Sequence, residues 1–559
     1  NNENLKQQRY YPRSTVVGQA VDGSAFVSNE KADRSQLDAL LTYDQTFGIH
    51  HLKLIAGASR ITYVAESSEM DALGFATDMF GYHNMSLAQT INYISTGRTE
   101  NEKRSFFGRG EYVLNDKYIF NVSFRADYAT HFGRDNRWGY FPSASFAWQL
   151  GDEPFMEFAR PLFSTIKLRA SYGQNGNDGI GYGLSQFQYR VSDVYLGGDA
   201  LQKMMYPYNP RNDELTWETT SQFDIGLDLA LWNSRIEVNF DWYYKKTTDL
   251  LNPVNISTSA GGFETYMGNN GELENKGFEL FIKSNNFSRP DFSWSTTLNL
   301  SHNKNKVLRL SDMEAKYEQI RPHGHYNFED YVMLKPGYSL SSIYGYKFAG
   351  IIQTGETYAP QPTSVAGDPK FVDVDGNGTI DLNDRTVLGD GNPDVIIGLG
   401  NNFRWKNFDF SFFLESAVGH KLLNLTRVLL EDENRLRASM DRWTQANPSN
   451  SIPRNGYRKD AGVKYGSYIN SRFVEDASYL RLQNIEIGYN LPIAKWGGLS
   501  RYIKACRIYV GAQNLFVLTG YTGFDPDVST NGGNPVAQGL DFSSYPAYRM
   551  YNCGLKITF

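Results

Sequence analysis

The sequence predicts an all-β fold, a transmembrane antiparallel β-barrel to which these 559 residues contribute about 17 strands. Apolar and polar residues alternate with a period of two along most of the chain, and short turns alternate with long polar loops. The composition agrees with this fold, because 14% of the residues are aromatic while the mean hydropathy is −0.48. In such a barrel only alternate side chains meet lipid, and the others stay polar.

The alternation is clearest between residues 222 and 245. Apolar side chains from Phe223 to Leu231 alternate with polar or small ones, and after a turn at 232–234 the pattern resumes from Ile236 to Tyr244. Similar segments lie at 118–126, 292–300 and 395–414, and the chain closes on an amphipathic segment, 551–559, that ends in Phe559. Most of these segments have close to the roughly 9–11 residues that a tilted strand needs to cross a bilayer.

The connections differ in length on the two sides of the predicted barrel. Minimal turns are expected at 115–116, 232–234 and 406–407. Long polar loops are expected at 63–102, 178–214, 309–325, 353–393, 425–470 and 520–545. Bacterial outer-membrane barrels have short periplasmic turns and long extracellular loops. We therefore predict an outer-membrane location, with extracellular long loops and a periplasmic C-terminus.

The number of predicted strands is odd, and the first is a descending strand near Leu37. A closed single-chain barrel of this kind needs an even number. We therefore expect residues 1–559 to be the C-terminal part of the barrel, with its N-terminal remainder outside this sequence.

Several functions are disfavoured. A net charge of −6 does not favour a nucleic-acid partner. No set of residues suggests an enzyme, since the eight His show no Ser/His/Asp or Cys/His spacing. His323 and His325 are two isolated His on a predicted loop, which are more often solvated than metal ligands. Cys506 and Cys553 fall on successive predicted strands, where they are either close together or simply two small apolar residues.

One segment has the spacing of a calcium loop. Residues 373–384, within the predicted extracellular insertion 353–393, match the 12-residue EF-hand loop, with Gly378 at the position of the sharp turn. The candidate ligands are Asp373, Asp375, Asn377, Thr379, Asp381 and Asp384. Asp384 is shorter than the usual bidentate Glu, and neither flank resembles an amphipathic helix. The alternatives are a structural Ca²⁺ site and a turn-forming cluster of Asp, Asn and Gly without a metal.

Taken in order, several motifs resemble the SusC/RagA-type TonB-dependent outer-membrane transporters of Bacteroidetes. They are YIFNVSFRADYATHFGRDNRWGYFPSASFAWQL (118–150), LRASYGQNGN (168–177), LTWETT (215–220), NKGFE (275–279), IYGY (343–346), EDASYLRLQNIEIGYNLP (475–492) and NLFVLTGYTGFDPD (514–527). The resemblance covers nearly the whole chain, and it is the ordered set rather than any single motif that is specific.

The resemblance implies a 22-stranded barrel closed by a plug, energised through TonB and covered by a SusD-type surface lipoprotein. It implies glycans or peptides as cargo. The plug and the TonB-contacting segment are not in this sequence, so two hypotheses stand. The first is a TonB-dependent importer of oligomeric nutrients. The second is a non-transporting SusC-like barrel that serves as a structural subunit of a surface assembly.

Two further groups of residues bear on these hypotheses. Aromatic residues in the predicted loops either stack on sugar rings or pack the loops together: Tyr206, Tyr208, Trp443, Tyr457, Tyr465, Tyr521 and Phe524. Charged residues on the polar side of the strands are expected to form the wall of the lumen: Arg125, Asp127, Arg169, Asp224, Asp228, Glu237 and Asp241.

Overall fold

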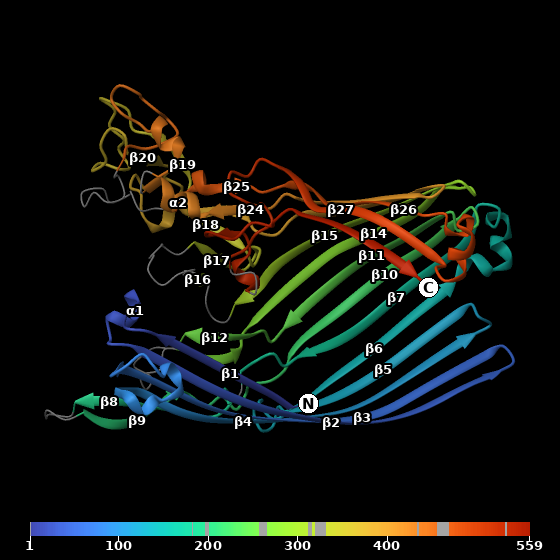
Figure 1. The fold of residues 1–559 in the computed structure, drawn as a ribbon, viewed down its shortest axis with the longest axis horizontal. Helices are drawn as coiled ribbons and strands as arrows, with labels where there is room; N and C mark the ends of the chain where they lie inside the picture. The colour runs from blue at the N-terminus through green and yellow to red at the C-terminus, as the bar shows by residue number, and fades with distance from the viewer. Residues whose placement is uncertain are drawn as a thin grey trace. The chain divides into compact units, whose positions relative to one another are not determined.

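A computed structural model describes residues 2–181, 183–195, 201–255, 265–310, 316–318, 331–432, 435–455, 469–530 and 534–559. Within them, sixteen strands are hydrogen-bonded in chain order as one sheet (Figure 1). These are β1 (Asn2–Tyr11), β2 (Ser24–Phe47), β3 (His50–Phe75), β4 (Ala88–Leu114), β5 (Tyr118–Ala129), β6 (Trp138–Gln149), β7 (Phe163–Asn177), β10 (Glu218–Leu231), β11 (Ile236–Thr248), β14 (Gly271–Ser288), β15 (Phe292–Leu310), β22 (Val395–Trp405), β23 (Phe408–Val418), β26 (Tyr479–Asn490), β27 (Ala505–Thr519) and β29 (Met550–Thr558).

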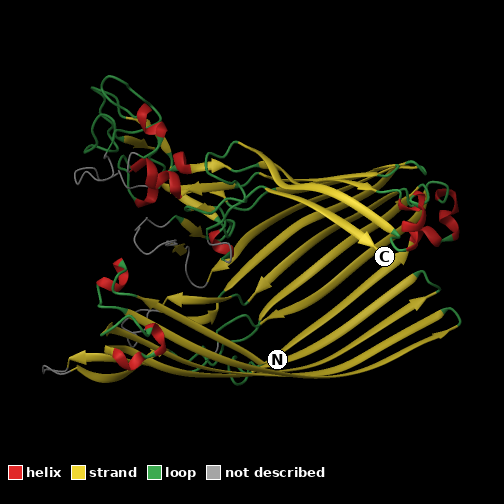
Figure 2. Cartoon of the chain, in the orientation of Figure 1, coloured by secondary structure: helices red, strands yellow, loops and turns green. Residues whose placement is uncertain are grey.

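The remaining elements are short and lie in the connections (Figure 2). Small two-stranded sheets pair β8 (Gln188–Tyr195) with β9 (Leu201–Asn209), β12 (Leu251–Asn255) with β13 (Thr265–Asn269), and β19 (Phe348–Ile351) with β20 (Pro369–Phe371). A four-stranded sheet is formed by β16 (Lys316–Glu318), β17 (Val332–Leu334), β18 (Ser342–Tyr346) and β21 (Arg385–Asp390). A three-stranded sheet is formed by β25 (Val474–Asp476), β24 (Lys421–Asn424) and β28 (Leu540–Asp541). The α-helices of the described residues are α1 (Val16–Gln19) and α2 (Leu425–Asp432). No helix in the described part of the chain is long and apolar enough to cross a membrane.

The chain divides into two compact units. The first comprises Asn1–Phe146, Ser171–Ser221 and Thr247–Asn270, and the second comprises Ala147–Ala170, Gln222–Lys246 and Gly271–Phe559. In the first unit, β2, β3 and β4 are 24, 26 and 27 residues long. They therefore extend well beyond the roughly 9–11 residues that a bilayer requires of a strand.

The predicted short turns are confirmed, and their backbone explains the residues found there. Asn115 and Asp116 connect β4 to β5 with φ of 53° and 55°. Positive φ at both central residues is the geometry that matches the twist of a tight hairpin, and Asn and Asp adopt it at little cost. Trp232, Asn233 and Ser234 also have positive φ between β10 and β11, as does Lys406 between β22 and β23.

Several sequence-based expectations about strands and loops are wrong. The predicted loop 63–102 is mostly strand, because β3 and β4 continue through it with paired backbones to within a connection at 76–87. This stretch is rich in Thr, Ser and Glu, so its polarity hid its strand character. The first strand is not near Leu37, since β2 begins at Ser24 and β1 precedes it. The main sheet has sixteen strands among the described residues, close to the predicted number of about 17.

The predicted loops 309–325 and 353–393 belong to one long connection between β15 and β22. This connection holds the short strands β16 to β21, of which β16, β20 and β21 lie in stretches predicted as loops. It packs in the second unit around a hydrophobic core formed by Tyr331, Val332, Ile343, Leu423, Leu425, Val428, Ile469, Phe473, Leu540 and Phe542. The core draws on three connections, so the long loops of this unit fold together as a packed body.

Candidate functional site

The calcium-type loop lies between β20 and β21 in the second unit. The turns within it require glycine, because Gly376 and Gly378 adopt φ of 74° and 84°. The backbone N–H groups of these two glycines donate to the two carboxylate oxygens of Asp373, each at 2.8 Å. The first carboxylate of the loop is therefore held in place by the backbone that curls around it.

Asp384 closes the loop from its other end. Its side chain is fully buried, and its Oδ1 and Oδ2 accept hydrogen bonds from the backbone N–H groups of Val374 and Asp381, each at 2.7 Å. The aspartate at the twelfth position thus fastens the beginning of the loop to its ninth position. A short 3₁₀ turn, Leu382–Asp384, brings it there.

The structure brings three of the predicted ligands together. Carboxylate oxygens of Asp373, Asp375 and Asp384 lie within 4.8 Å of one another. The amide of Asn377 donates to Asp375 Oδ2 at 3.0 Å and to Asp381 Oδ2 at 3.4 Å, so these two side chains border the same cluster. Thr379 is placed by its backbone N–H, which donates to Asn377 Oδ1 at 2.8 Å. In an EF-hand loop, this seventh position contributes its backbone carbonyl rather than its side chain.

The electrostatics of the loop favour a cation. The N–H groups of Gly378 and then Gly376 hold the pKa of Asp373 below its usual range. Burial raises the pKa of the nearby Tyr358 hydroxyl, and the charges of Asp373 and Asp384 raise it further. Three carboxylates within this distance repel one another unless a cation lies between them. Oxygen ligands from short acidic and amide side chains suit Ca²⁺.

A hydrophobic anchor attaches the loop to the body of the unit. Ile380, at the eighth position of the loop, is fully buried against Tyr346 and Phe371, and Phe348 packs on the same cluster. Its backbone N–H donates to the carbonyl oxygen of Pro360 at 3.0 Å. Ile380 therefore points into the body of the unit, while the polar residues on either side of it offer oxygen atoms to the loop.

Truncating this anchor tests its role. Replacing Ile380 with Ala is expected to cost about 2–5 kcal/mol of local stability, because it leaves a cavity between Tyr346 and Phe371. Hydrogen exchange of the 373–384 amides should accelerate while exchange in β22 and β23 stays unchanged. Leu382→Ala is the matched control, because Leu382 is 71% exposed. Equal exchange rates in the two variants would contradict the anchoring role.

The other candidate residues in the loops separate into packed, exposed and undescribed groups. Tyr521 is buried and donates through its hydroxyl to Asp541 at 2.6 Å, and Trp443 donates through Nε1 to Gln353 Oε1 at 3.0 Å. Phe524 is 75% exposed. His323, His325, Tyr457 and Tyr465, as well as the side chain of Tyr208, lie outside the described residues. Tyr521 and Trp443 therefore pack the loops together, the second of the two predicted roles.

The two cysteines are free thiols on neighbouring strands. Cys506 on β27 pairs in register with Ile557, and Cys553 on β29 pairs with Val510. The two cysteines are thus several residues apart along the sheet. Cys506 is buried and Cys553 is exposed, which fits the reading of two small apolar residues.

Ion pairs organise the polar face of the sheet in the second unit. Arg169 donates to both carboxylate oxygens of Asp228 at 2.9 and 2.8 Å and lies 2.8 Å from Asp241. Asn239 adds a 2.8 Å hydrogen bond to Asp228. These charges satisfy one another across β7, β10 and β11, as the predicted polar wall requires. Arg125 and Asp127 of the first unit pair in the same way, at 2.7 Å.

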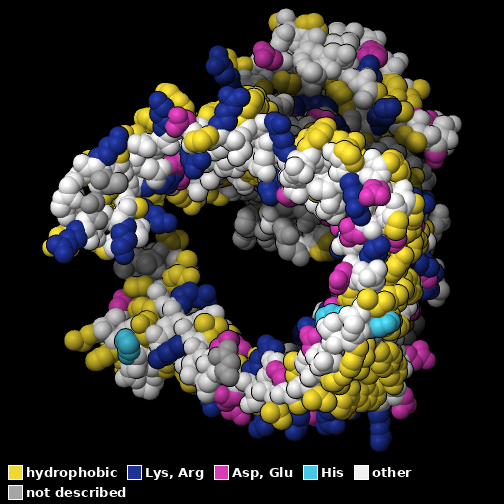
Figure 3. All heavy atoms as spheres, turned by 90° about the vertical axis from the view of Figure 1, so that its right-hand side faces the viewer, with side chains coloured by type: hydrophobic (Ala, Val, Ile, Leu, Met, Phe, Trp, Pro, Cys, Tyr) yellow, Lys and Arg dark blue, Asp and Glu magenta, His cyan; other side chains and the backbone are white. Residues whose placement is uncertain are grey.

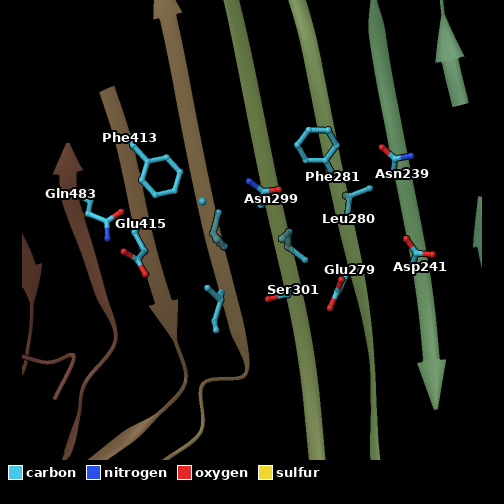
Figure 4. Close-up of a pocket in the computed structure, with 14 residues that line it drawn as sticks. Asn239, Asp241, Glu279, Leu280, Phe281, Asn299, Ser301, Phe413, Glu415 and Gln483 are labelled. Atoms are coloured by element: carbon cyan, nitrogen blue, oxygen red, sulfur yellow. The ribbon is translucent and has the colours of Figure 1, made fainter. Parts of the chain in front are cut away.

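A pocket of about 360 Å³ opens on this polar face (Figure 4). Carboxylates of Asp241, Glu279 and Glu415 point into the region together with amides of Asn239, Asn299 and Gln483 (Figure 4). The aromatic rings of Phe281 and Phe413 add two apolar surfaces. Of these residues, only Asp241 is among the predicted lumen-wall residues. The others could have been found from the same alternation once the register was known, because Phe281 pairs with Asn299 and Asn299 pairs with Gly398.

Gly398 makes room for one of these rings. A Cβ at this position would lie 3.0 Å from the ring of Phe413. Glycine therefore allows the aromatic ring to lie close over β22, which a larger residue would prevent. The pocket combines carboxylates, amides and aromatic faces, a set that binds ligands rich in hydrogen-bond donors.

Comparison with known proteins decides the family. The profile described as TonB dependent receptor-like, beta-barrel, matches residues 2–515. The chain belongs to this family. It is 35% identical over 570 residues to TonB-dependent receptor P3 of Formosa agariphila, covering 100% of this chain and 55% of that protein. It is 30% identical over 487 residues to TonB-dependent receptor SusC of Bacteroides thetaiotaomicron, covering 85% of this chain and 45% of that protein.

Among solved structures, the fold is similar to that of the RagAB peptide transporter. The TM-score is 0.82 at 22% identity, covering 100% of this chain and 59% of that chain. The predicted resemblance to SusC/RagA-type receptors and the outer-membrane location are confirmed. The chain spans about half the length of the curated relatives it matches. The matched proteins are named as receptors or transporters, which supports a non-enzymatic role.

Proposed function

We propose that this TonB-dependent receptor barrel belongs to an importer of oligomeric nutrients, either glycans or peptides, that works with a SusD-like lipoprotein lid. Energy would come from TonB through sequence outside these 559 residues. The family assignment carries the proposal, together with the relationship to a protein named SusC. The structural similarity to a peptide transporter supports cargo of oligomeric size.

The polar pocket of the second unit supports a role in cargo contact. Glu279 on β14 and Glu415 on β23 offer charged acceptors, and Phe281 and Phe413 offer faces on which a sugar ring or an apolar side chain can stack. A polar pocket lined in this way offers hydrated cargo several hydrogen-bond partners and two stacking surfaces.

The test uses the full-length protein with its lid lipoprotein in the native outer membrane. Uptake of labelled oligosaccharide and peptide panels should depend on the protein and on TonB. Glu279→Gln should weaken apparent cargo affinity about 10-fold, the effect of losing one charge-assisted hydrogen bond. Glu237→Gln is the matched control, since Glu237 lies 3.3 Å from Lys283 and does not line the pocket.

Each outcome separates the two hypotheses. TonB-dependent uptake of either panel supports import and identifies the cargo class. If deleting the protein leaves uptake of every panel member unchanged but removes the lid lipoprotein from the cell surface, the protein is a structural subunit instead.

We also propose that residues 373–384 bind Ca²⁺ as a structural ion. The support is the ligand spacing, the cluster of Asp373, Asp375 and Asp384, and the buried anchor Ile380. Asp373, Asp375, Asn377, Asp381 and Asp384 would offer side-chain oxygens, and Thr379 its carbonyl. A bound ion would stiffen the long connection between β15 and β22 and would take no part in catalysis.

A further inference from the structure

The apolar side of the first unit ends in a row of arginines. Directly paired residues of an antiparallel sheet project to the same side. One row across β2 to β5 consists of Tyr43, Leu54, Gly110 and Val122, and its three larger side chains are exposed. Other exposed apolar residues continue this side: Leu37, Leu41, Phe106, Phe120 and Phe124. This is the side that faces lipid in an outer-membrane barrel.

The row of paired residues that contains Leu37 is charged rather than apolar. Leu37 pairs with Arg60, Arg60 with Arg104, and Arg104 with Tyr128. Leu37 is six positions from Tyr43, so the two project from the same side of β2. The arginines therefore lie on the lipid-facing side, where charge is costly near the middle of the bilayer and tolerated at its interface.

Two guanidinium groups directly opposite each other require a counter-charge. Glu102 provides one, with Oε1 lying 2.6 Å from Arg60 Nε and 2.9 Å from Arg104 Nε. The arginine side chains stay 60% and 50% exposed, while that of Glu102 is 20% exposed. A single carboxylate cannot use the five N–H donors that each guanidinium carries. The row therefore keeps a positive charge and donors that face outward.

A third arginine joins the row through an aromatic residue. Arg137 donates through Nη1 to the Tyr128 hydroxyl at 3.1 Å, and the guanidinium carbons of Arg104 and Arg137 lie 5.4 and 5.9 Å from the centre of the Tyr128 ring. The Tyr128 and Trp138 rings are 5.3 Å apart, and Phe106 stacks on Trp138 at 6.2 Å. Tyr and Trp at this level are typical of the aromatic girdle at a membrane interface.

The height of the row agrees with an interface. At about 3.3 Å per residue, Leu37 lies roughly 33 Å along β2 from Phe47, which precedes the short turn. A strand tilted by about 40° converts this length to roughly 25 Å, the height of the apolar band of an outer-membrane barrel. The row lies toward the loop end of the strands, which is the extracellular end in such barrels.

We propose that Arg60, Arg104 and Arg137 bind the phosphate of an outer-leaflet lipid. Guanidinium groups bind phosphate through paired, charge-assisted hydrogen bonds. Tyr128 and Glu102 hold the guanidiniums in position. The apolar residues immediately beside the row, Phe106 and Leu37, would contact acyl chains. A lipid contacts the arginines and the apolar residues at once, whereas a free phosphate ion contacts only the arginines.

The test uses full-length protein extracted from outer membranes in mild detergent. Mass spectrometry measures the phosphorylated lipid retained per protein. The double variant Arg60→Gln/Arg104→Gln should retain at least about fivefold less, because two bidentate donors are lost. Arg109→Gln is the matched control, since Arg109 lies on β4 but five positions from Arg104, on the opposite side. Heat-modifiable electrophoretic mobility confirms that each variant is assembled.

A second measurement separates the sources of phosphate. In nanodiscs, the wild-type protein should bind a phosphorylated outer-leaflet lipid in preference to the same lipid without phosphate, and inorganic phosphate should compete poorly. Equal retention by wild type and double variant, equal binding of the dephosphorylated lipid, or full competition by inorganic phosphate would each overturn the proposal. If the double variant fails to assemble, the single variants Arg60→Gln and Arg104→Gln are measured in its place.

Discussion

Replacing Asp384 with Asn should lower the affinity of the 373–384 loop for Ca²⁺ by on the order of 100-fold, the loss expected for a charged ligand. Asp384 is one of the three clustered carboxylates, and it is the only one of them that is fully buried. The amide that replaces it cannot accept both backbone hydrogen bonds from Val374 and Asp381. The variant therefore loses a charge and the closure of the loop together.

Titration of full-length protein with Ca²⁺, followed by calorimetry or by luminescence of bound terbium, measures this affinity. Asp390→Asn is the control, because Asp390 lies on the adjoining strand β21 and its Oδ1 accepts from Asn392 N–H at 2.9 Å. An unchanged affinity in Asp384→Asn, or no Ca²⁺ uptake by the wild type at millimolar concentration, would refute the site.

The pH dependence of Ca²⁺ binding follows from Asp373. Its pKa is lowered in the folded protein, mainly by the N–H of Gly378, so the carboxylate stays charged at pH values where a free aspartate begins to take up a proton. The stabilisation it provides is full above the unfolded pKa and disappears only as pH falls through the lower, folded pKa. We therefore expect that protonation of Asp373 does not lower the Ca²⁺ affinity between pH 7 and pH 5, measured in the same titration.

The period-two pattern was sufficient to predict the transmembrane strands and their tight turns. Alternation within 222–245 requires only that one side of the sheet be apolar, and β10 and β11 follow it. It failed for 63–102, because the strands there extend beyond the apolar band and both their sides become polar. In that stretch the sheet is continued by backbone hydrogen bonds, which do not require apolar and polar residues to alternate.

The calcium-type loop could be predicted from the sequence, whereas the polar pocket could not. All the ligands of the calcium-type loop lie within twelve consecutive residues, so their spacing is visible directly. The polar pocket combines Asp241, Glu279 and Glu415 from strands far apart in sequence. Their approach depends on strand register, which a single sequence does not reveal. The arginine row has the same origin, because Arg60 and Arg104 meet only through the pairing of β3 with β4.

A second large effect is expected at a buried ion pair in the second unit. Arg481 on β26 donates to Asp525 Oδ1 at 2.6 Å, and both side chains are 6% exposed. Asp525 also accepts from the backbone N–H groups of Asp527 and Ala547, each at 3.0 Å, so it ties together the two ends of the connection between β27 and β29. Arg481→Leu should cost about 3–5 kcal/mol, because it strands a buried carboxylate.

Hydrogen exchange of residues 521–530 measures this cost, since the loss should appear as local opening rather than unfolding of the sheet. Arg211→Leu is the control, because the Arg211–Asp213 pair, at 2.7 Å, has both side chains more than half exposed. An exposed pair contributes about 0–1 kcal/mol. Equal exchange in the two variants would show that burial does not govern the energy of the Arg481 pair.

The double variant Arg481→Leu/Asp525→Leu separates the charge from the hydrogen bonds. Removing both partners leaves no buried charge, so most of the stability lost in Arg481→Leu should return. The N–H groups of Asp527 and Ala547 still lose their acceptor, so their two amides should exchange faster than in the wild type. If the double variant is as unstable as Arg481→Leu, the hydrogen bonds lost with Asp525 cost as much as the stranded charge. The buried pair would then serve chiefly to place Asp525 where it can fasten the loop.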